Sequence, residues 1–250
     1  MIRTICAAFC LMLVSVVSSA PAAAQDMPRK EQPFCTYPAP GKVIFRGDGS
    51  DLATCLDGAH ERIISELRLS VRGGDTAMVL KLAGRYAGRL EHLIVEDRCS
   101  GPCASYIVPV AARLTVEPNA LLLLQPAFDA EKLIAKMKQL KTEMERSRPG
   151  RTITLSPSES EAWAIEKEQD DFDRRWLSCR QWLHPDTLPT TPEWTKRQPQ
   201  IPAEKITATI VSKTMATRCL KQTKLAAFWS PTSEKDIPAP LRTEGAVLVP

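Results

Sequence analysis

The sequence contains few of the residues that build metal centres, and it lacks the surface pattern of a nucleic-acid-binding protein. Only 3 histidines occur among its 250 residues, and it has neither a CxxC motif nor a cysteine–histidine pair at the spacing of zinc ligands. Its 33 lysines and arginines nearly balance its 29 aspartates and glutamates, and no basic stripe is interleaved with aromatic residues. We therefore expect no metal, no cofactor and no nucleic-acid partner.

Long apolar runs are also missing, except at the N-terminus. Arg3 precedes an apolar segment over residues 5–17, and three alanines precede Gln25 in the manner of a cleavage site. A transmembrane anchor is the alternative, but the segment is short for a hydrocarbon layer of about 30 Å. We predict a signal peptide over residues 1–24 and an exported protein, periplasmic or secreted from a bacterium. We expect no stable membrane span after signal removal.

The cysteines that remain in the exported chain indicate disulfides. Of 8 cysteines, Cys6 and Cys10 fall in the predicted leader, which leaves 6. An even number in an exported chain favours disulfides over free thiols, although many pairings are open. Proximity along the chain alone favours the pairs Cys35–Cys55, Cys99–Cys103 and Cys179–Cys219.

Alternating strand and helix patterns predict an α/β core over residues 42–147. Leu67, Leu69 and Val71 alternate with polar residues, as in a strand with one buried face. Short connections between strands and helices favour βαβ units. The predicted strands are residues 42–45, the end of segment 52–69, 90–96, 114–116 and 121–124, and the predicted helices are 76–87 and 102–112.

The segments that flank this core carry no recognisable chemistry. They are a proline-rich extended lead-in over residues 25–41, a helical C-terminal extension over 148–230 and a proline-containing tail over 231–250. A long helix is predicted over residues 156–183, where Ser158 and Glu161 resemble a capping box.

A further helix is predicted at the end of the core, where Leu133, Met137, Leu140 and Met144 recur at helical spacing. Such a stripe usually docks on its own domain. The alternative is self-association, which would make the protein a homo-oligomer.

The Gly73-Gly74 turn is the first candidate site. Glycines let the backbone approach a ligand closely, and N–H groups aimed outward are the usual construction of an oxyanion hole. The start of a helix near Pro102 would add the positive end of a helix dipole. The alternative is that Gly73-Gly74 is only a tight turn that connects a strand to a helix.

Three motifs, taken in order, resemble the Clp protease/crotonase superfamily. They span Leu69 to Asp75, Cys99 to Tyr106 and Asn119 to Gln125. They are similar to exported bacterial members whose signature is a strand ending in S-x-G-G, a C-A-S-x-C-A helix start and a strand ending in histidine. The resemblance covers residues 42–145. It implies a Clp/crotonase-like core of repeated ββα and βαβ units with a helical C-terminal extension, and assembly into trimers or rings.

The sequence departs from this family at the reacting groups. The family's motif serine is the expected nucleophile and its strand-end histidine is the base. Matching Cys99 and Cys103 places Gly101 at the serine position, and Gln125 falls at the histidine position. Arg72 also replaces the small residue before the glycine pair. Because glycine has no nucleophile and glutamine cannot exchange a proton near neutral pH, the inherited pair cannot operate.

The preferred hypothesis is an exported, catalytically inactive binding or structural module, a pseudoenzyme of a serine hydrolase fold. Its cleft would hold a peptide or a small carbonyl ligand between Gly73, Gly74, Gly101 and Gln125. Two alternatives stay open. A cell-envelope assembly would use the C-terminal third as its working surface. An active periplasmic serine hydrolase or peptidase would use Ser100 or Ser105 with His60, His92 or His184.

Overall fold

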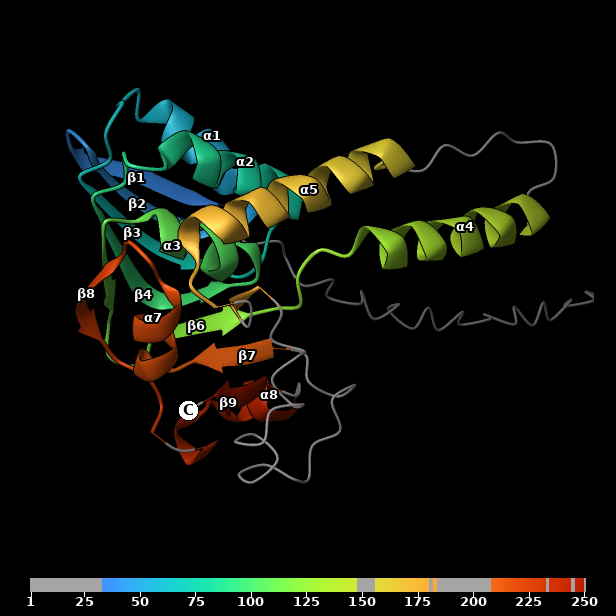
Figure 1. The fold of residues 1–250 in the computed structure, drawn as a ribbon. Helices are drawn as coiled ribbons and strands as arrows, with labels where there is room; N and C mark the ends of the chain where they lie inside the picture. Colours follow the sequence, from blue (N-terminus) through green and yellow to red (C-terminus); the bar gives the residue numbers. More distant parts are fainter. Residues whose placement is uncertain are drawn as a thin grey trace, which may run out of the picture. The chain divides into compact units, whose positions relative to one another are not determined.

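In the computed structural model the chain is an α/β protein whose helices cover a mixed sheet (Figure 1). The structure describes residues 33–147, 156–179, 182–183, 208–232, 234–243 and 246–249. The strands are β1 (Phe34–Ala39), β2 (Lys42–Gly47), β3 (Glu66–Val71), β4 (His92–Ser100), β5 (Arg113–Val116), β6 (Leu121–Leu124), β7 (Ala208–Val211), β8 (Lys224–Phe228) and β9 (Ala246–Val249). The helices are α1 (Gly49–Gly58), α2 (Thr76–Tyr86), the π-helical turn η1 (Cys103–Ile107) with α3 (Val108–Val110), α4 (Ala130–Ser147), α5 (Glu159–Trp176), α7 (Lys213–Cys219), the 3-10 turn η5 (Glu234–Asp236) and α8 (Ala239–Thr243).

The sheet branches at β4. Its main path runs β1-β2-β3-β4-β6-β7-β9, while β5 pairs with β4 and β8. The first half of β4 pairs in parallel with β5, from His92 opposite Arg113 onward. Its last residues pair in parallel with β6, where Arg98 lies opposite Leu121 and Ser100 opposite Leu123. The carboxyl ends of β3, β4 and β6 therefore meet at one edge of the sheet, because β3 and β4 are parallel as well.

Local signals explain how β3 passes into α2. The Asp75 carboxylate accepts a hydrogen bond of 2.9 Å from the Met78 N–H, which caps the helix where its first N–H groups lack partners. The helix ends before Gly88, whose φ of +73° favours glycine. The predicted order of strand, glycine turn and helix is confirmed.

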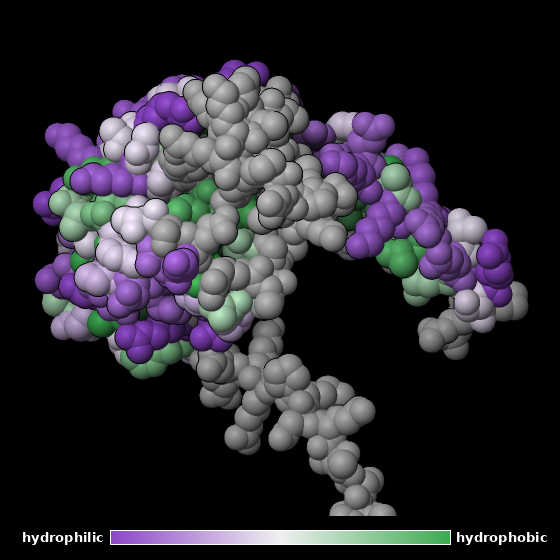
Figure 2. All heavy atoms as spheres, turned by 90° about the horizontal axis from the view of Figure 1, so that it is seen from below, coloured by the Kyte–Doolittle hydropathy of each residue, from purple (hydrophilic) through white to green (hydrophobic). Residues whose placement is uncertain are grey.

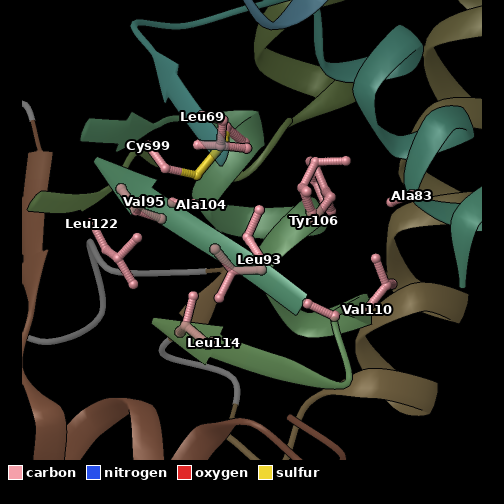
Figure 3. Packing of buried hydrophobic residues seen from close by; sticks show 14 of the residues in the cluster. Leu69, Ala83, Leu93, Val95, Cys99, Ala104, Tyr106, Val110, Leu114 and Leu122 are labelled. Atoms are coloured by element: carbon pink, nitrogen blue, oxygen red, sulfur yellow. A yellow bond between two sulfur atoms is a disulfide. The ribbon is translucent and has the colours of Figure 1, made fainter. Parts of the chain in front are cut away.

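One face of the sheet forms the main core with the helices. Leu67, Leu69 and Leu93 are fully buried there beside residues of α1, α2 and η1. Figure 3 shows members of this cluster from the strands together with Tyr106 of η1 and Ala83 of α2. Burying each such leucine stabilises the fold by about 1.5–3 kcal/mol.

The opposite face of the sheet carries a network of ion pairs in one part and a second apolar cluster in another. On β3, the Arg68 guanidinium contacts the carboxylates of Glu66, Glu96 and Glu117 at 3.0 to 3.5 Å. Towards β6, β7 and β9 the same face is covered by a second apolar cluster. Its buried members are Leu121, Leu123, Ile210, Ile237, Leu241 and Ala246.

Both predicted flanks contribute strands to the sheet, which corrects our expectation for them. Residues 34–39, predicted as lead-in, form edge strand β1, antiparallel to β2. The predicted helical extension and tail supply β7, β8 and β9 in addition to helices. Segments of four or five residues are too short to show a periodicity of their own. The predicted helix over 156–183 is shorter and ends at Trp176, although its Ser158–Glu161 capping box is present.

Helices α4 and α5 pack against each other beside the sheet (Figure 1). Ala130, Ile134 and Ala162 are buried between them. Further along α4, Leu140 and Met144 are 42% and 39% exposed. In Figure 2 the projecting arm that contains α4 is largely hydrophilic, with a few apolar positions. The predicted stripe therefore packs on the protein at its start only.

All three predicted cysteine pairs form disulfides. The Cα atoms of Cys35 and Cys55 are 5.8 Å apart, those of Cys99 and Cys103 5.5 Å, and those of Cys179 and Cys219 4.9 Å. These separations lie within the usual range for a bridge, and three bridges fit an oxidising compartment. Over the ranges described here, no helix has the length and apolar character needed to cross a bilayer.

Loop length predicts how much each disulfide stabilises the fold. Cys179–Cys219 closes 40 residues and Cys99–Cys103 only 4. Removing the first pair with two alanines should lower the free energy of unfolding by about 4 kcal/mol, and removing the second by about 2 kcal/mol, because the longer loop restrains the unfolded chain more. Urea unfolding of both variants measures this order. A larger loss for the Cys99–Cys103 variant, or free thiols in peptide mapping of the native protein, would contradict it.

Candidate functional site

The Gly73-Gly74 turn is fixed against the start of α1. The Gly49 N–H donates to the Gly73 carbonyl at 3.0 Å, and the Asp75 N–H donates to the Ser50 hydroxyl at 2.8 Å. A Cβ on Gly74 would lie 2.9 Å from the Gly49 Cα, and the Gly74 φ is +137°. Close packing of two backbones therefore requires glycine at this turn.

The N–H groups of Gly73 and Gly74 have no protein acceptor within the described ranges. Both residues are only partly buried, so water or a ligand can reach them. Two adjacent N–H groups after a strand are the kind of donors that stabilise an anionic oxygen. The turn therefore presents the two backbone N–H donors that we predict there from the sequence.

Gly101 forms the sharp connection between β4 and the helix that begins at Pro102. Its φ is +60°, in the left-handed region. Its N–H donates to the Leu123 carbonyl at 2.8 Å, and its carbonyl accepts from the Ser105 N–H at 3.0 Å. A tight strand-to-helix turn of this kind is how a nucleophile elbow presents a side chain in a serine hydrolase. Here the position has no side chain.

Gln125, which directly follows β6, fills the space beside Gly101. Its Oε1 lies 2.5 Å from the place that a Cβ on Gly101 would occupy. The structure therefore brings together the two positions that the sequence matched to a nucleophile and its base. A side chain on residue 101 would therefore require the Gln125 amide to shift.

Pro102 is a further departure that sequence reasoning missed. In nucleophile elbows, the N–H of the residue after the nucleophile commonly donates to the oxyanion. Proline has no N–H, so this donor is absent next to Gly101. The missing donor could have been predicted from the sequence, because Pro102 immediately follows Gly101.

The alternative serines have no base in the described structure. Ser100 is 6% exposed and its hydroxyl donates to the Val71 carbonyl at 3.1 Å. Ser105 is 5% exposed within η1. Among the described residues, neither hydroxyl is hydrogen-bonded to an imidazole.

The histidines proposed to serve those serines lie elsewhere or outside the described ranges. His92 stands at the opposite end of β4 from Ser100, about 26 Å away for a strand of that length. It is half-buried, and its Nε2 lies 2.9 Å from the Thr115 hydroxyl. Desolvation lowers the pKa of His92. It is therefore not a fully solvated surface residue. His60 is exposed beyond α1, and His184 lies outside the described residues.

Gly74 and Gln125 line different cavities among those whose lining the structure describes, so a single cleft that contains Gly73, Gly74, Gly101 and Gln125 stays a prediction. Gly74 lines a cavity of about 730 Å³ between the start of α2 and helices α4 and α5. Gln125 lines a second cavity of about 400 Å³. The residues that line this second cavity, called here the Gln125 cavity, are Arg72, Arg98, Ser100, Leu123, Gln125, Ala208, Leu241 and Ala246.

Two guanidinium groups give the Gln125 cavity its charge. Arg72 and Arg98 line it, and no carboxylate is among the described lining residues. The Arg98 Nε is buried and makes no hydrogen bond within the described structure. Its nearest charged partner is an Asp97 carboxylate oxygen at 3.6 Å, which is beyond hydrogen-bonding distance.

The loop that carries Gln125 is held from α5. The buried Gln169 amide accepts from the Phe128 N–H at 3.1 Å and donates to the Phe128 carbonyl at 3.2 Å. The Tyr106 hydroxyl donates to the same amide at 2.6 Å. Burial raises the pKa of Tyr106, so its hydroxyl stays protonated and can donate. This clamp fixes the segment between β6 and α4.

Gly101→Ala should destabilise the protein through both its backbone and its neighbour. A left-handed conformation costs a non-glycine residue about 1–2 kcal/mol, and the new Cβ would also meet the Gln125 amide. We expect a loss of about 1–3 kcal/mol in urea unfolding, mainly from the backbone, because the neighbouring atom is the end of a flexible side chain.

Gly84→Ala is the matched control, because a Cβ there meets nothing within 4 Å in the middle of α2. It should raise stability by about 0.5–1 kcal/mol. Combining Gly101→Ala with Gln125→Ala should recover part of the loss. Additive losses in that double variant would contradict the contact between the two positions.

Comparison with known proteins does not identify a family for this chain. No protein-family model matches the sequence. No curated protein matches it either. The function must therefore be argued from the site itself.

Proposed function

We propose that this protein is an exported binding module built on a Clp protease/crotonase-like fold, in which the serine–histidine pair has been replaced. The three ordered motifs of the sequence support the family, and the α/β layers are compatible with it. The three disulfides support an exported setting.

One observation carries the loss of catalysis. The Gln125 side chain lies where a side chain on residue 101 would have to project. Two positions that face each other at a strand-to-helix turn are suited to a nucleophile and its base. In this chain one of them has no side chain, and the other has an amide that does not titrate.

The surroundings of this pair also do not suit acyl transfer. A base needs a third group to orient it, and the described lining of the Gln125 cavity contains no carboxylate. The donor after the nucleophile position is lost at Pro102. These features together favour binding without turnover.

The remaining hydrogen-bonding groups and the cavity are suited to binding a ligand. The Gly73 and Gly74 N–H groups have no protein acceptor in the described ranges, and the Gln125 amide offers both a donor and an acceptor. A cavity of about 400 Å³ falls within the usual size of small-molecule sites, about 300–1,000 Å³. We propose a peptide or a small carbonyl compound as the ligand.

An active hydrolase that uses Ser100 is the second candidate, because this serine lines the Gln125 cavity. A fluorophosphonate probe distinguishes the two candidates. We expect no adduct on the wild-type protein by intact mass, with Ser100→Ala and Ser105→Ala giving the same result. A stoichiometric adduct that either substitution abolished would establish the hydrolase instead.

The inferred geometry can be tested by restoring the missing groups. Gly101→Ser/Gln125→His should react slowly with the same probe, because the two positions adjoin. The rate should stay at least about 10²–10³-fold below that of a complete hydrolase, since Pro102 removes one oxyanion donor. Gly101→Ser alone is the control and should not react. A folded double variant with no reactivity would count against a former nucleophile position.

Self-association through α4 stays a prediction. A role as a subunit of an envelope assembly, which would use the C-terminal third, is a separate prediction. Leu140 and Met144 are the exposed apolar positions that a second copy could cover. If they form an interface, Leu140→Lys/Met144→Lys should convert an oligomer to a monomer in size-exclusion chromatography with light scattering. Thr142→Lys, on the same helix, should not. A wild-type protein that is monomeric at high concentration would exclude this interface.

A further inference from the structure

The Gln125 cavity lies at the edge of the sheet where a ligand site is most often found. Arg72 follows β3, Ser100 ends β4 and Gln125 follows β6, so the cavity forms outside the carboxyl ends of three neighbouring parallel strands. In open α/β sheets this edge is where ligands bind. Its far wall comes from β7, α8 and β9.

The arginines of the cavity favour an anion. Two guanidinium groups are among its described lining residues, and positively charged groups in a cleft attract anions. Guanidinium groups also match the planar geometry of a carboxylate, which they can bind through two parallel hydrogen bonds.

Arg98 lines this cavity and has one buried donor without a hydrogen bond. Its Nε is buried without a hydrogen bond, although leaving a buried charged donor unsatisfied is costly. Arg68, on the neighbouring strand, differs because three carboxylates surround it. Asp97 does not supply what Arg98 lacks, since it lies 3.6 Å from Nε and accepts a hydrogen bond from the Ser70 hydroxyl at 3.1 Å.

The remaining lining residues indicate what the anion is attached to. Leu123, Ala208, Leu241 and Ala246 form an apolar wall. A fully hydrated multivalent anion gains nothing from such a wall, whereas a carboxylate on an aliphatic group places its charge on the arginines and its carbon chain on the wall. Gln125 can donate to a carboxylate oxygen or accept from a neighbouring amide N–H.

We propose that the Gln125 cavity binds the carboxylate of an aliphatic ligand, either a free short-chain acid or the C-terminus of a peptide that ends in an apolar residue. The inference builds on the proposed binding role and names its ligand class. Arg98 and Arg72 hold the carboxylate, Gln125 orients the adjoining polar group, and the wall from Leu123 to Ala246 receives the aliphatic part.

Isothermal titration calorimetry on the purified protein tests this assignment. The probes are hexanoate, N-acetyl-alanyl-leucine and the C-terminal amide of the same peptide. At least one of the two acids should bind saturably, and the amide should bind at least about tenfold more weakly, because a charge-assisted hydrogen bond is lost. Binding of hexanoate alone would identify a free acid as the source, and binding of the peptide acid alone would identify a C-terminus.

Substitutions of the cavity arginines test whether the acids bind in the Gln125 cavity. Arg98→Gln and Arg72→Gln should each weaken acid binding by at least about tenfold. Arg113→Gln, an exposed arginine at the start of β5, is the matched control and should leave the affinity within about twofold, the effect expected of a screened surface charge. Unchanged thermal unfolding midpoints verify that the variants are folded.

Four outcomes would overturn the carboxylate assignment: equal affinity for acid and amide, equal affinity for inorganic phosphate, no effect of either cavity arginine, or no binding of either acid. None of them depends on labelling by the fluorophosphonate probe. A protein that stays unreactive but fails to bind the acids would refute this inference alone. A reactive protein would refute the proposed loss of catalysis alone.

Discussion

The site depends on one backbone constraint, the left-handed turn at Gly101. At this point β4 stops and a helix begins, and both peptide groups of Gly101 are committed, the N–H to Leu123 and the carbonyl to Ser105. The first bond ties β4 to β6, and the second starts the helix. Because Gln125 follows β6 directly, the same two bonds set its side chain against Gly101.

The surrounding contacts make this turn rigid. The Cys99–Cys103 disulfide bridges it, and the Trp182 indole N–H donates to the Ala104 carbonyl at 3.2 Å. From the other side Gln169 holds the loop after Gln125 through Phe128. A reacting group requires such support. Here the supported side chain is the Gln125 amide, which does not titrate. The turn therefore has the support that a nucleophile elbow requires, although Gly101 carries no side chain.

The sequence predicts the centre of the fold well and its periphery poorly, for a physical reason. From β3 to β4, the elements have their own period and their own stop signals, such as the Asp75 cap and Gly88. By contrast β7 and β9 have four residues each and are strands only because β6 pairs with β7 and β7 with β9. Arg98 falls between these cases. Its place on the face opposite the main core follows from the alternation along β4, but the cavity it lines is closed by residues more than a hundred positions later, at Ala208, Leu241 and Ala246.

The residues of the Gln125 cavity are also electrostatically consistent with one another. A histidine at position 125 would share the cavity with Arg72 and Arg98 and with no described carboxylate. Nearby positive charge lowers the pKa of an imidazole, so it would hold a proton poorly at the moment when acyl transfer requires an imidazolium. The protonation state of a glutamine does not depend on nearby charges, because its amide does not titrate. The neutral residue at position 125 is therefore compatible with the arginines around it, as the proposed anion site requires.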